Sequence, residues 1–146
     1  MVNNNDSKNS SINETSSQAY PPGTIVVTVK SDLSGSNQPT HRIVSSSIHQ
    51  DKRVIGVYGN PLESEPLGDE FEYKHQFMSL GDGIILVSNQ NGNIENGDYI
   101  TTASGSGGYG CKQNSEFLAN YTVAKSLEDV DWSTESETTK LIPYSC

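Results

Sequence analysis

The stretch Thr24-Ile25-Val26-Val27-Thr28-Val29-Lys30 determines the fold class that the sequence predicts. Six β-branched residues follow one another in it, and such side chains pack well on a pleated strand but lose conformational freedom in a helix. Further apolar or alternating runs follow, separated by Gly, Asn and Pro turn signals. We therefore predict short strands at residues 24–30, 42–46, 53–58, 71–77, 84–87, 94–102, 120–125 and 139–144.

Long amphipathic helix patterns do not occur between these runs, and we expect only a short helix near residues 115–119. The run Ile84-Ile85-Leu86-Val87 is the most apolar one and predicts a central strand. The predicted fold class is therefore all-β: a small sandwich or partly closed barrel of short antiparallel strands.

The domain organisation is predicted from composition. A chain of 146 residues suits one domain. Residues 1–22 hold few apolar side chains among Asn, Ser, Thr and Gln, so alone they cannot bury enough surface to offset the entropy cost of ordering. We predict a flexible or partner-ordered arm at residues 1–22 and a single β domain at residues 23–146.

Charge and hydropathy argue against two classes of protein. Nine basic and eighteen acidic residues give a net charge of −9, which repels the phosphate backbone, so no nucleic acid is expected as a partner. No run approaches the ~20 apolar residues of a helical membrane span. The first residues have neither the basic nor the apolar region of a signal peptide, which predicts synthesis in the cell interior without secretion.

Cysteines are few. Cys111 and Cys146 are too widely spaced for a disulfide scaffold, and no Cys-x-x-Cys pair suggests zinc. A single bridge between the two remains open.

Two local patterns suggest ligand sites only weakly. Residues 105–110 fit the glycine spacing of dinucleotide-binding loops, but no helix pattern follows them, so a glycine-rich hairpin or bulge is the better interpretation. Five residues match positions of a calcium loop, namely Asn89, Asn91, Gly92, Ile94 and Asp98, yet Val87 at its first position offers no side-chain oxygen. We expect no cofactor and no metal.

Catalytic residues are not assigned. Ser45-Ser46-Ser47 lies near His49 and Asp51, but the G-x-S-x-G nucleophile pattern is absent and a polar loop explains the cluster equally well. Trp132 is expected to pack in the core or at a strand edge, with an interface role as the alternative.

Several blocks of sequence together carry a resemblance to a known family. Residues 53–60 are weakly specific; residues 91–102, which contain Asn96-Gly97-Asp98-Tyr99-Ile100, are followed by Gly108-Tyr109-Gly110 and then by residues 118–125 and 128–131. Over roughly residues 50–146 this order resembles the C-terminal domains of viral and phage fibre or appendage proteins, which are similar to the autoproteolytic intramolecular-chaperone family called peptidase G2. The resemblance implies an association with the virion, a β-rich fold and a trimer. Tyr58 follows Gly56-Val57 where the family often has a serine, so no catalytic residue is carried over.

The expected function is that of a non-enzymatic virion structural protein: a minor capsid, decoration or fibre-tip module. It would contact other capsid or fibre subunits and form a homo-oligomer, with a trimer favoured. One alternative is an autoproteolytic intramolecular chaperone domain of a viral fibre. The other is a glycan- or receptor-binding module for host attachment on the virion surface, with its aromatic residues drawn from Tyr20, Tyr58, Tyr73, Tyr109, Tyr121 and Trp132.

Two glycine-containing segments are candidate turn or assembly elements. Gly97 can take the positive φ that a tight turn between Asn96 and Asp98 needs. The glycines at 105–110 allow two backbones to approach closely. The structural candidates are Gly92, Asn96, Gly97, Asp98, Gly108, Tyr109 and Gly110.

Overall fold

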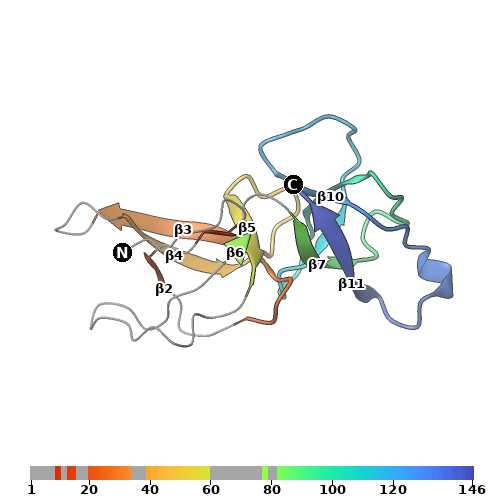
Figure 1. Cartoon of the computed structure of the whole chain (residues 1–146), viewed down its shortest axis with the longest axis horizontal. Helices are drawn as coiled ribbons and strands as arrows, with labels where there is room; N and C mark the ends of the chain where they lie inside the picture. The colour runs from red at the N-terminus through yellow and green to blue at the C-terminus, as the bar shows by residue number, and fades with distance from the viewer. Residues whose placement is uncertain (1–8, 11–12, 16–19, 34–38, 60–76, 79–81) are drawn as a thin grey trace.

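The computed structural model describes residues 9–10, 13–15, 20–33, 39–59, 77–78 and 82–146. These residues form a six-stranded sheet and a closed five-stranded barrel, which lie side by side (Figure 1). The all-β prediction is confirmed. The elements are β1 (Asn9–Ser10), β2 (Asn13–Thr15), β3 (Ile25–Leu33), β4 (Pro39–Ser45), β5 (Val54–Tyr58), β6 (Phe77–Met78), β7 (Asp82–Ser88), β8 (Tyr99–Thr102), β9 (Gly110–Lys112), β10 (Thr122–Ser126), the 3₁₀ helix η1 (Trp132–Thr134) and β11 (Thr139–Ser145).

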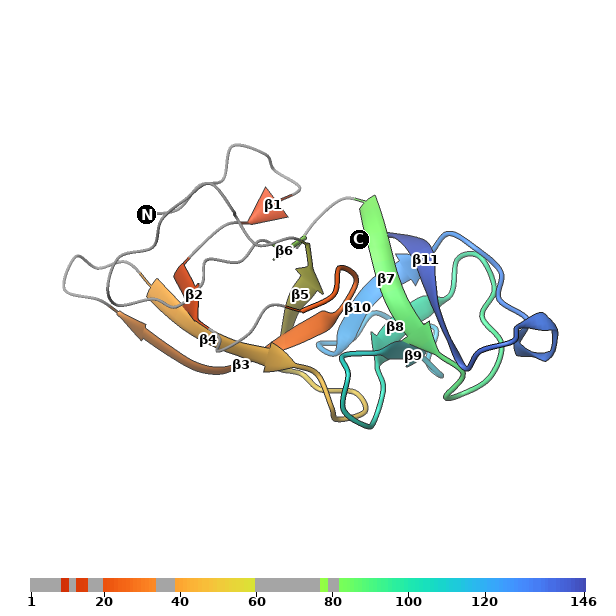
Figure 2. The same cartoon turned by 90° about the horizontal axis from the view of Figure 1, so that it is seen from below.

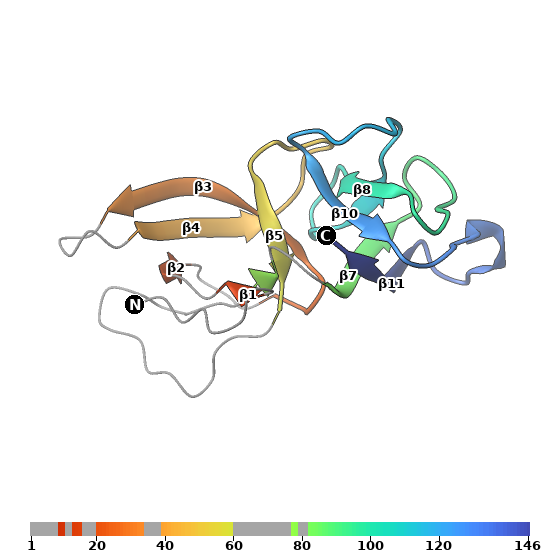
Figure 3. The same cartoon turned by 45° about the horizontal axis from the view of Figure 1, so that its top comes forward.

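The sheet has the strand order β1-β6-β5-β3-β4-β2. Its pairs are antiparallel except β2–β4, which is parallel. The β3–β4 pair is a long ribbon that points away from the barrel (Figure 3). One register shift lies between Thr28 and Lys30, and a second lies between Val26 and Val27. Bulges of this kind increase strand twist and let the ribbon bend as it leaves the barrel.

The barrel has the strand order β10-β11-β7-β9-β8, and β8 pairs with β10 to close it. Figure 2 shows these strands gathered on one side of the molecule. Its longest pair is β7–β11, which is in register from Asp82↔Ser145 to Ser88↔Thr139. The β7–β9 contact at Val87↔Gly110 is parallel, whereas the other pairs are antiparallel. Closure removes free sheet edges among these strands.

Two apolar clusters form the core, and β3 contributes to both. Ile25 is fully buried in the barrel cluster, whereas its neighbour Val26 is fully buried in the sheet cluster with Ile43 and Tyr58. Successive side chains of a strand point to opposite faces, so one strand can supply both clusters. The barrel cluster comprises Ile25, Val57, Ile85, Val87, Ile94, Ile100, Ala124, Val130, Ile142 and Tyr144.

Gly23 connects the start of β3 to the barrel on one side. Its carbonyl oxygen accepts a hydrogen bond from Leu86 N (2.9 Å), and its own N–H donates to Tyr58 O (3.0 Å). Gly23 has φ +95°, and a Cβ there would lie 2.6 Å from Leu141 Cδ2. A residue with a side chain would therefore adopt a strained φ here and displace the Leu141 side chain.

Gly108 connects β3 to the barrel on the other side. Its carbonyl oxygen accepts from Ile25 N (2.8 Å), and its N–H donates to Ser46 O (3.1 Å). With φ +72°, a Cβ at this position would overlap Thr24 Cγ2 and lie 2.9 Å from Ile25 O. The close approach that the glycine cluster predicts is thus made inside the chain, at the junction of sheet and barrel.

The predicted helix at residues 115–119 is wrong. These residues form an irregular loop, and in the part of the chain that the structure describes the only helix is η1. The loop is determined by side-chain hydrogen bonds from the buried Gln113, which sequence periodicity does not reveal. No helix of the described residues is long and apolar enough to cross a membrane.

Some predictions cannot be compared with the structure in full. The predicted strand at 71–77 lies outside the described residues except for Phe77, which begins β6. Within the predicted arm, β1 and β2 pair with β6 and β4. The division into an arm at 1–22 and a domain at 23–146 stays a prediction.

The Gly108 junction leads to a stability prediction. Gly108→Ala introduces a Cβ into contact with Thr24 and Ile25 at a positive φ, so we expect the free energy of unfolding to fall by about 3 kcal/mol. Gly105→Ala is the matched control, because Gly105 also has a positive φ but a Cβ added there would meet nothing within 4 Å. We expect a loss of about 1–2 kcal/mol there. Urea unfolding measures both, and equal losses would contradict the close-approach explanation.

Candidate functional site

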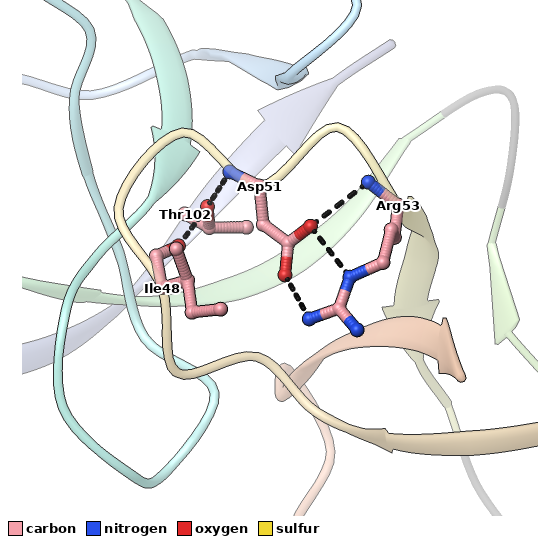
Figure 4. A network of polar contacts seen from close by, with 4 residues as sticks. All are labelled: Ile48, Asp51, Arg53 and Thr102. Atoms are coloured by element: carbon pink, nitrogen blue, oxygen red, sulfur yellow. Dashed lines mark hydrogen bonds and ion pairs between the residues drawn. The ribbon is translucent and has the colours of Figure 1, made fainter.

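The serine, histidine and aspartate residues of segment 45–51 do not meet as a catalytic group. Ser46 is fully buried. His49 Nε2 lies 3.1 Å from Nδ2 of the Asn91 side chain. The Asp51 carboxylate is bound by Arg53 (Figure 4). Among the described residues, none of the three serine hydroxyls hydrogen-bonds His49 or Asp51. The segment is a polar loop between β4 and β5.

Asp51 instead holds this loop against the barrel. Its Oδ1 accepts from Arg53 N (2.9 Å) and Nε (3.0 Å), and its Oδ2 accepts from Nη2 (2.8 Å). Its own N–H donates to Thr102 Oγ1 (2.7 Å), and that hydroxyl donates to Ile48 O (2.7 Å) (Figure 4). The hydrogen bonds from Arg53 lower the pKa of Asp51 below its ordinary value. The network is structural and links the β4–β5 loop to β8.

The calcium-like pattern is a set of turns. Ile94 is buried in a bridge with Val130, and the Asp98 carboxylate accepts from Glu95 N (2.8 Å). Asn91 Nδ2 donates to Lys112 O (3.0 Å). No group of three or more His, Cys, Asp or Glu side chains that could hold a metal ion occurs within the described ranges.

The candidate turn residues lie in separate places. Gly92 ends a turn with φ +92°, and Gly97, with φ +101°, donates its N–H to Ser126 O (2.8 Å). Asn96 precedes it, and its N–H donates to Asp129 Oδ1 (2.7 Å). Asp98 closes that turn. Gly108 and Gly110 lie at the β3 junction and in β9, and the Tyr109 ring packs over Gly107.

The aromatic residues considered for glycan binding are mostly packed. Tyr20 and Tyr58 meet edge to face, with ring centroids 5.5 Å apart. Trp132 packs against the barrel cluster, and its Nε1 donates to Gly92 O (3.0 Å), which agrees with the expected packing role. Tyr73 lies outside the described residues.

Cys111 and Cys146 do not form a disulfide with each other. Cys111 is buried in β9, and burial raises the pKa of its thiol to about 11. Cys146 is exposed at the end of β11. Since the thiolate is the reactive form, Cys111 is chemically inert at neutral pH.

An apolar face covers the outside of the β7–β11 pair. Ile85 and Val87 point into the core, whereas Ile84 is 47% exposed. We define the β7–β11 face by the cross-strand pairs Ile84↔Pro143 and Leu86↔Leu141. Leu141 is also 47% exposed. The predicted central strand is thus buried on one side only, and its apolar run also supplies a surface.

A loop at residues 114–121 is held in one shape by a buried side chain. Gln113 is 3% exposed, and its Nε2 donates to Ser115 O (3.1 Å) and to Phe117 O (2.8 Å). Its Oε1 accepts from Thr122 Oγ1 (2.6 Å). Every polar atom of the amide side chain therefore has a partner.

This ordered loop exposes two large apolar residues. The side chains of Phe117 and Leu118 are 80% and 76% exposed. Exposed apolar residues are common on protein surfaces, but two adjacent ones on a hydrogen-bonded loop favour a contact surface. The signal in the sequence is a large apolar pair within an otherwise polar segment.

A hollow lies beside the loop. It has a volume of about 370 Å³ and is lined by Tyr99, Leu118, Val123, Lys125 and Cys146, among others. A more polar hollow of about 530 Å³ adjoins it and shares Tyr99 and Lys125. Lys125 Nζ lies 5.7 Å from the centre of the Tyr99 ring. Sequence reasoning missed Tyr99, because only the β8–β10 pairing brings it next to Lys125.

Comparison of this chain with family models, with curated proteins and with solved structures finds no match.

The Asp51 network leads to a prediction about pH. A folded pKa below the unfolded value stabilises the protein fully above the unfolded pKa, about 3.9, and this contribution is lost as the pH falls through the folded pKa. Asp51→Asn should lower the free energy of unfolding by about 1–2 kcal/mol at pH 7 and by less near pH 3. Urea unfolding at the two pH values measures the difference. A loss that is independent of pH would contradict the ionic explanation.

The Gln113 network leads to a prediction about loop order. Thr122 Oγ1 donates to Gln113 and accepts from Ala119 N (3.0 Å), so Thr122→Val should free that amide and speed its hydrogen exchange roughly tenfold or more. Thr138→Val, at an exposed threonine outside this network, should leave the exchange unchanged. Unchanged exchange at Ala119 in the Thr122 variant would show that the Thr122 hydroxyl does not order this end of the loop.

Proposed function

We propose that this chain is a non-enzymatic virion structural protein: a minor capsid, decoration or fibre-tip module that acts through protein–protein contacts. The observation that carries the proposal is the β7–β11 face. Ile84 and Leu141 are each about half exposed on it, although they belong to the longest strand pair of the barrel.

An antiparallel pair in a barrel ordinarily buries one face and presents polar side chains to water on the other. This pair is apolar on both faces, because Ile85 and Ile142 fill the core while Ile84, Leu86 and Leu141 lie outside. A contiguous apolar surface favours an interface with another protein. Its aliphatic side chains have no polar group to orient a small substrate, so a subunit contact fits better than a catalytic site.

The virion assignment is supported by the resemblance of residues 50–146 to viral and phage fibre or appendage domains. That resemblance also favours a trimer. Tyr58, at the position where the family often has a serine, is 1% exposed and packs against Tyr20. A buried tyrosine is a poor nucleophile, which supports a structural function over the autoproteolytic alternative. The glycan-binding alternative has less support, because Tyr20, Tyr58 and Trp132 are packed.

The mass of the purified chain tests this proposal. Denaturing mass spectrometry should give the intact 15.8 kDa chain, and native mass spectrometry should give a closed homo-oligomer, with a trimer at three times that mass. Two fragments that sum to the full chain would favour autoproteolysis. An intact monomer at every concentration would overturn the proposed self-assembly.

Charged substitutions test whether the subunit contact lies on the β7–β11 face. Leu141→Glu puts a charge on the apolar surface and should shift the oligomer toward monomer, because burying an unpaired charge is costly. Ile84→Glu should do the same from the neighbouring strand. Ile48→Glu is the control, since Ile48 is 53% exposed on the β4–β5 loop. An oligomer that survives both face variants would show that the contact lies elsewhere.

A further inference from the structure

We infer that Asn96 is a modification site of this chain, at which spontaneous deamidation converts the asparagine into aspartate and isoaspartate. Two Asn-Gly pairs lie in the β7–β8 loop, Asn91-Gly92 and Asn96-Gly97. An asparagine that precedes glycine is the most reactive arrangement, because glycine has no side chain to hinder the approach to its backbone nitrogen. The inference does not depend on the proposed assembly, since the reaction needs only water and the chain itself.

The reaction is a cyclisation followed by hydrolysis. The Gly97 nitrogen loses its proton to solvent and attacks Cγ of Asn96, so that a succinimide ring forms and the side-chain nitrogen leaves as ammonia. Water then adds to one of the two ring carbonyl carbons and breaks its bond to the ring nitrogen. Opening at Cγ gives aspartate. Opening at the backbone carbonyl carbon gives isoaspartate, in which the main chain runs through the side chain.

The Asn96 side chain can turn toward the reacting nitrogen. Asn96 is exposed, and its side-chain amide makes no hydrogen bond among the described residues. The turn itself is held by two backbone donors: Asn96 N donates to Asp129 Oδ1 (2.7 Å), and Gly97 N donates to Ser126 O (2.8 Å). The attack therefore takes place when this surface turn opens locally.

The Asn91-Gly92 pair is an internal control, because its side-chain amide is bound. Asn91 Nδ2 donates to Lys112 O (3.0 Å) in β9 and lies 3.1 Å from His49 Nε2. Asn91 must give up these contacts before its side chain can reach the next backbone nitrogen. The loss of one additional hydrogen bond slows such a reaction about tenfold.

Deamidation adds negative charge to a turn that is already acidic. The Asp129 carboxylate binds the Asn96 N–H, and the Asp98 carboxylate accepts from Glu95 N (2.8 Å) in the same turn. A new carboxylate at residue 96 is repelled by these neighbours. Isoaspartate also lengthens the backbone by one carbon, which displaces the hydrogen bond from Asp98 N to Glu95 O (2.9 Å).

The modified turn is joined to the barrel core. Ile94 N donates to Val130 O (3.0 Å), Val130 N donates to Ile94 O (2.7 Å), and both side chains are buried in the barrel cluster. Ser126 N donates to Asp98 O (2.8 Å) on the other side of the turn. Modification at residue 96 therefore weakens the pairing of residues 94–98 with residues 126–130.

Ageing of the purified chain tests the site. One sample is kept folded in mildly alkaline buffer and another in concentrated urea, and peptide mapping with fragment spectra quantifies the gain of one mass unit at each Asn-Gly pair. We expect Asn96 to react about tenfold or more faster than Asn91 in the folded protein, and at a similar rate in urea. A folded Asn91 that reacts as fast as Asn96 would overturn the inference. So would an Asn96 that is still unmodified when the urea sample has reacted completely.

Variants separate the two causes of the difference. Asp129→Ala removes the acceptor of the Asn96 N–H and should speed the reaction at Asn96 several-fold, whereas Asp129→Asn keeps an acceptor oxygen and should change the rate little. His49→Ala removes a contact of the other amide and should speed the reaction at Asn91 alone. An unchanged Asn96 rate in Asp129→Ala would contradict control of the site by this turn.

The effect on the barrel is measured on the products. Both products carry one more negative charge than the original chain, so anion exchange separates them from it. We expect the modified chains to unfold at a lower urea concentration, and Asn96→Asp to reproduce the part of this shift that comes from charge alone. Asn96→Gln is the control without a new charge. Modified chains as stable as the unmodified chain would contradict the disruption of the turn.

Discussion

The placement of Ile25 and Val26 in two different cores is the constraint on which the rest of the structure depends. Neighbouring side chains of a strand point to opposite faces, so β3 fills the barrel with one residue and the sheet with the next. This arrangement requires the barrel backbone to come close to β3. Gly108 allows that approach, because a side chain there would occupy the space of Thr24. Packing in the sheet and packing in the barrel are therefore coupled.

A second connection reinforces this coupling. Asp51 and Thr102 hold the β4–β5 loop to β8, so sheet and barrel are joined both at the start of β3 and at this loop. The loop that resembled a catalytic cluster therefore joins the sheet to the barrel. The barrel exposes the β7–β11 face, and Gln113 orders the loop that carries Phe117. Polar groups determine the shape of these loops, and we propose that the exposed apolar groups contact other subunits.

Sequence patterns predicted the fold class and most strands because β-branched runs such as 24–30 and 84–87 carry a local signal. They missed β9, since Gly110-Cys111-Lys112 is too short and too rich in glycine, and its partners β7 and β8 are chosen by tertiary packing. The irregular shape of the loop at 114–121 was not predicted for a similar reason. Its shape depends on one amide at residue 113, and no periodicity records a hydrogen bond to a carbonyl two or four residues away.

The β7–β11 pair takes both its core residues and its exposed apolar face from one sequence feature. Four consecutive apolar residues at 84–87 guarantee that the strand contributes to the core whichever of its faces turns inward. Once Ile85 and Val87 are buried, Ile84 and Leu86 must lie outside, and the apolar face follows from the register with β11. An antiparallel pair with one face in the core commonly has polar residues on the other. In a chain with 32% hydrophobic residues, keeping aliphatic side chains on the surface lowers the core that it can build, so a contact that covers them is the physical reason we propose for their presence.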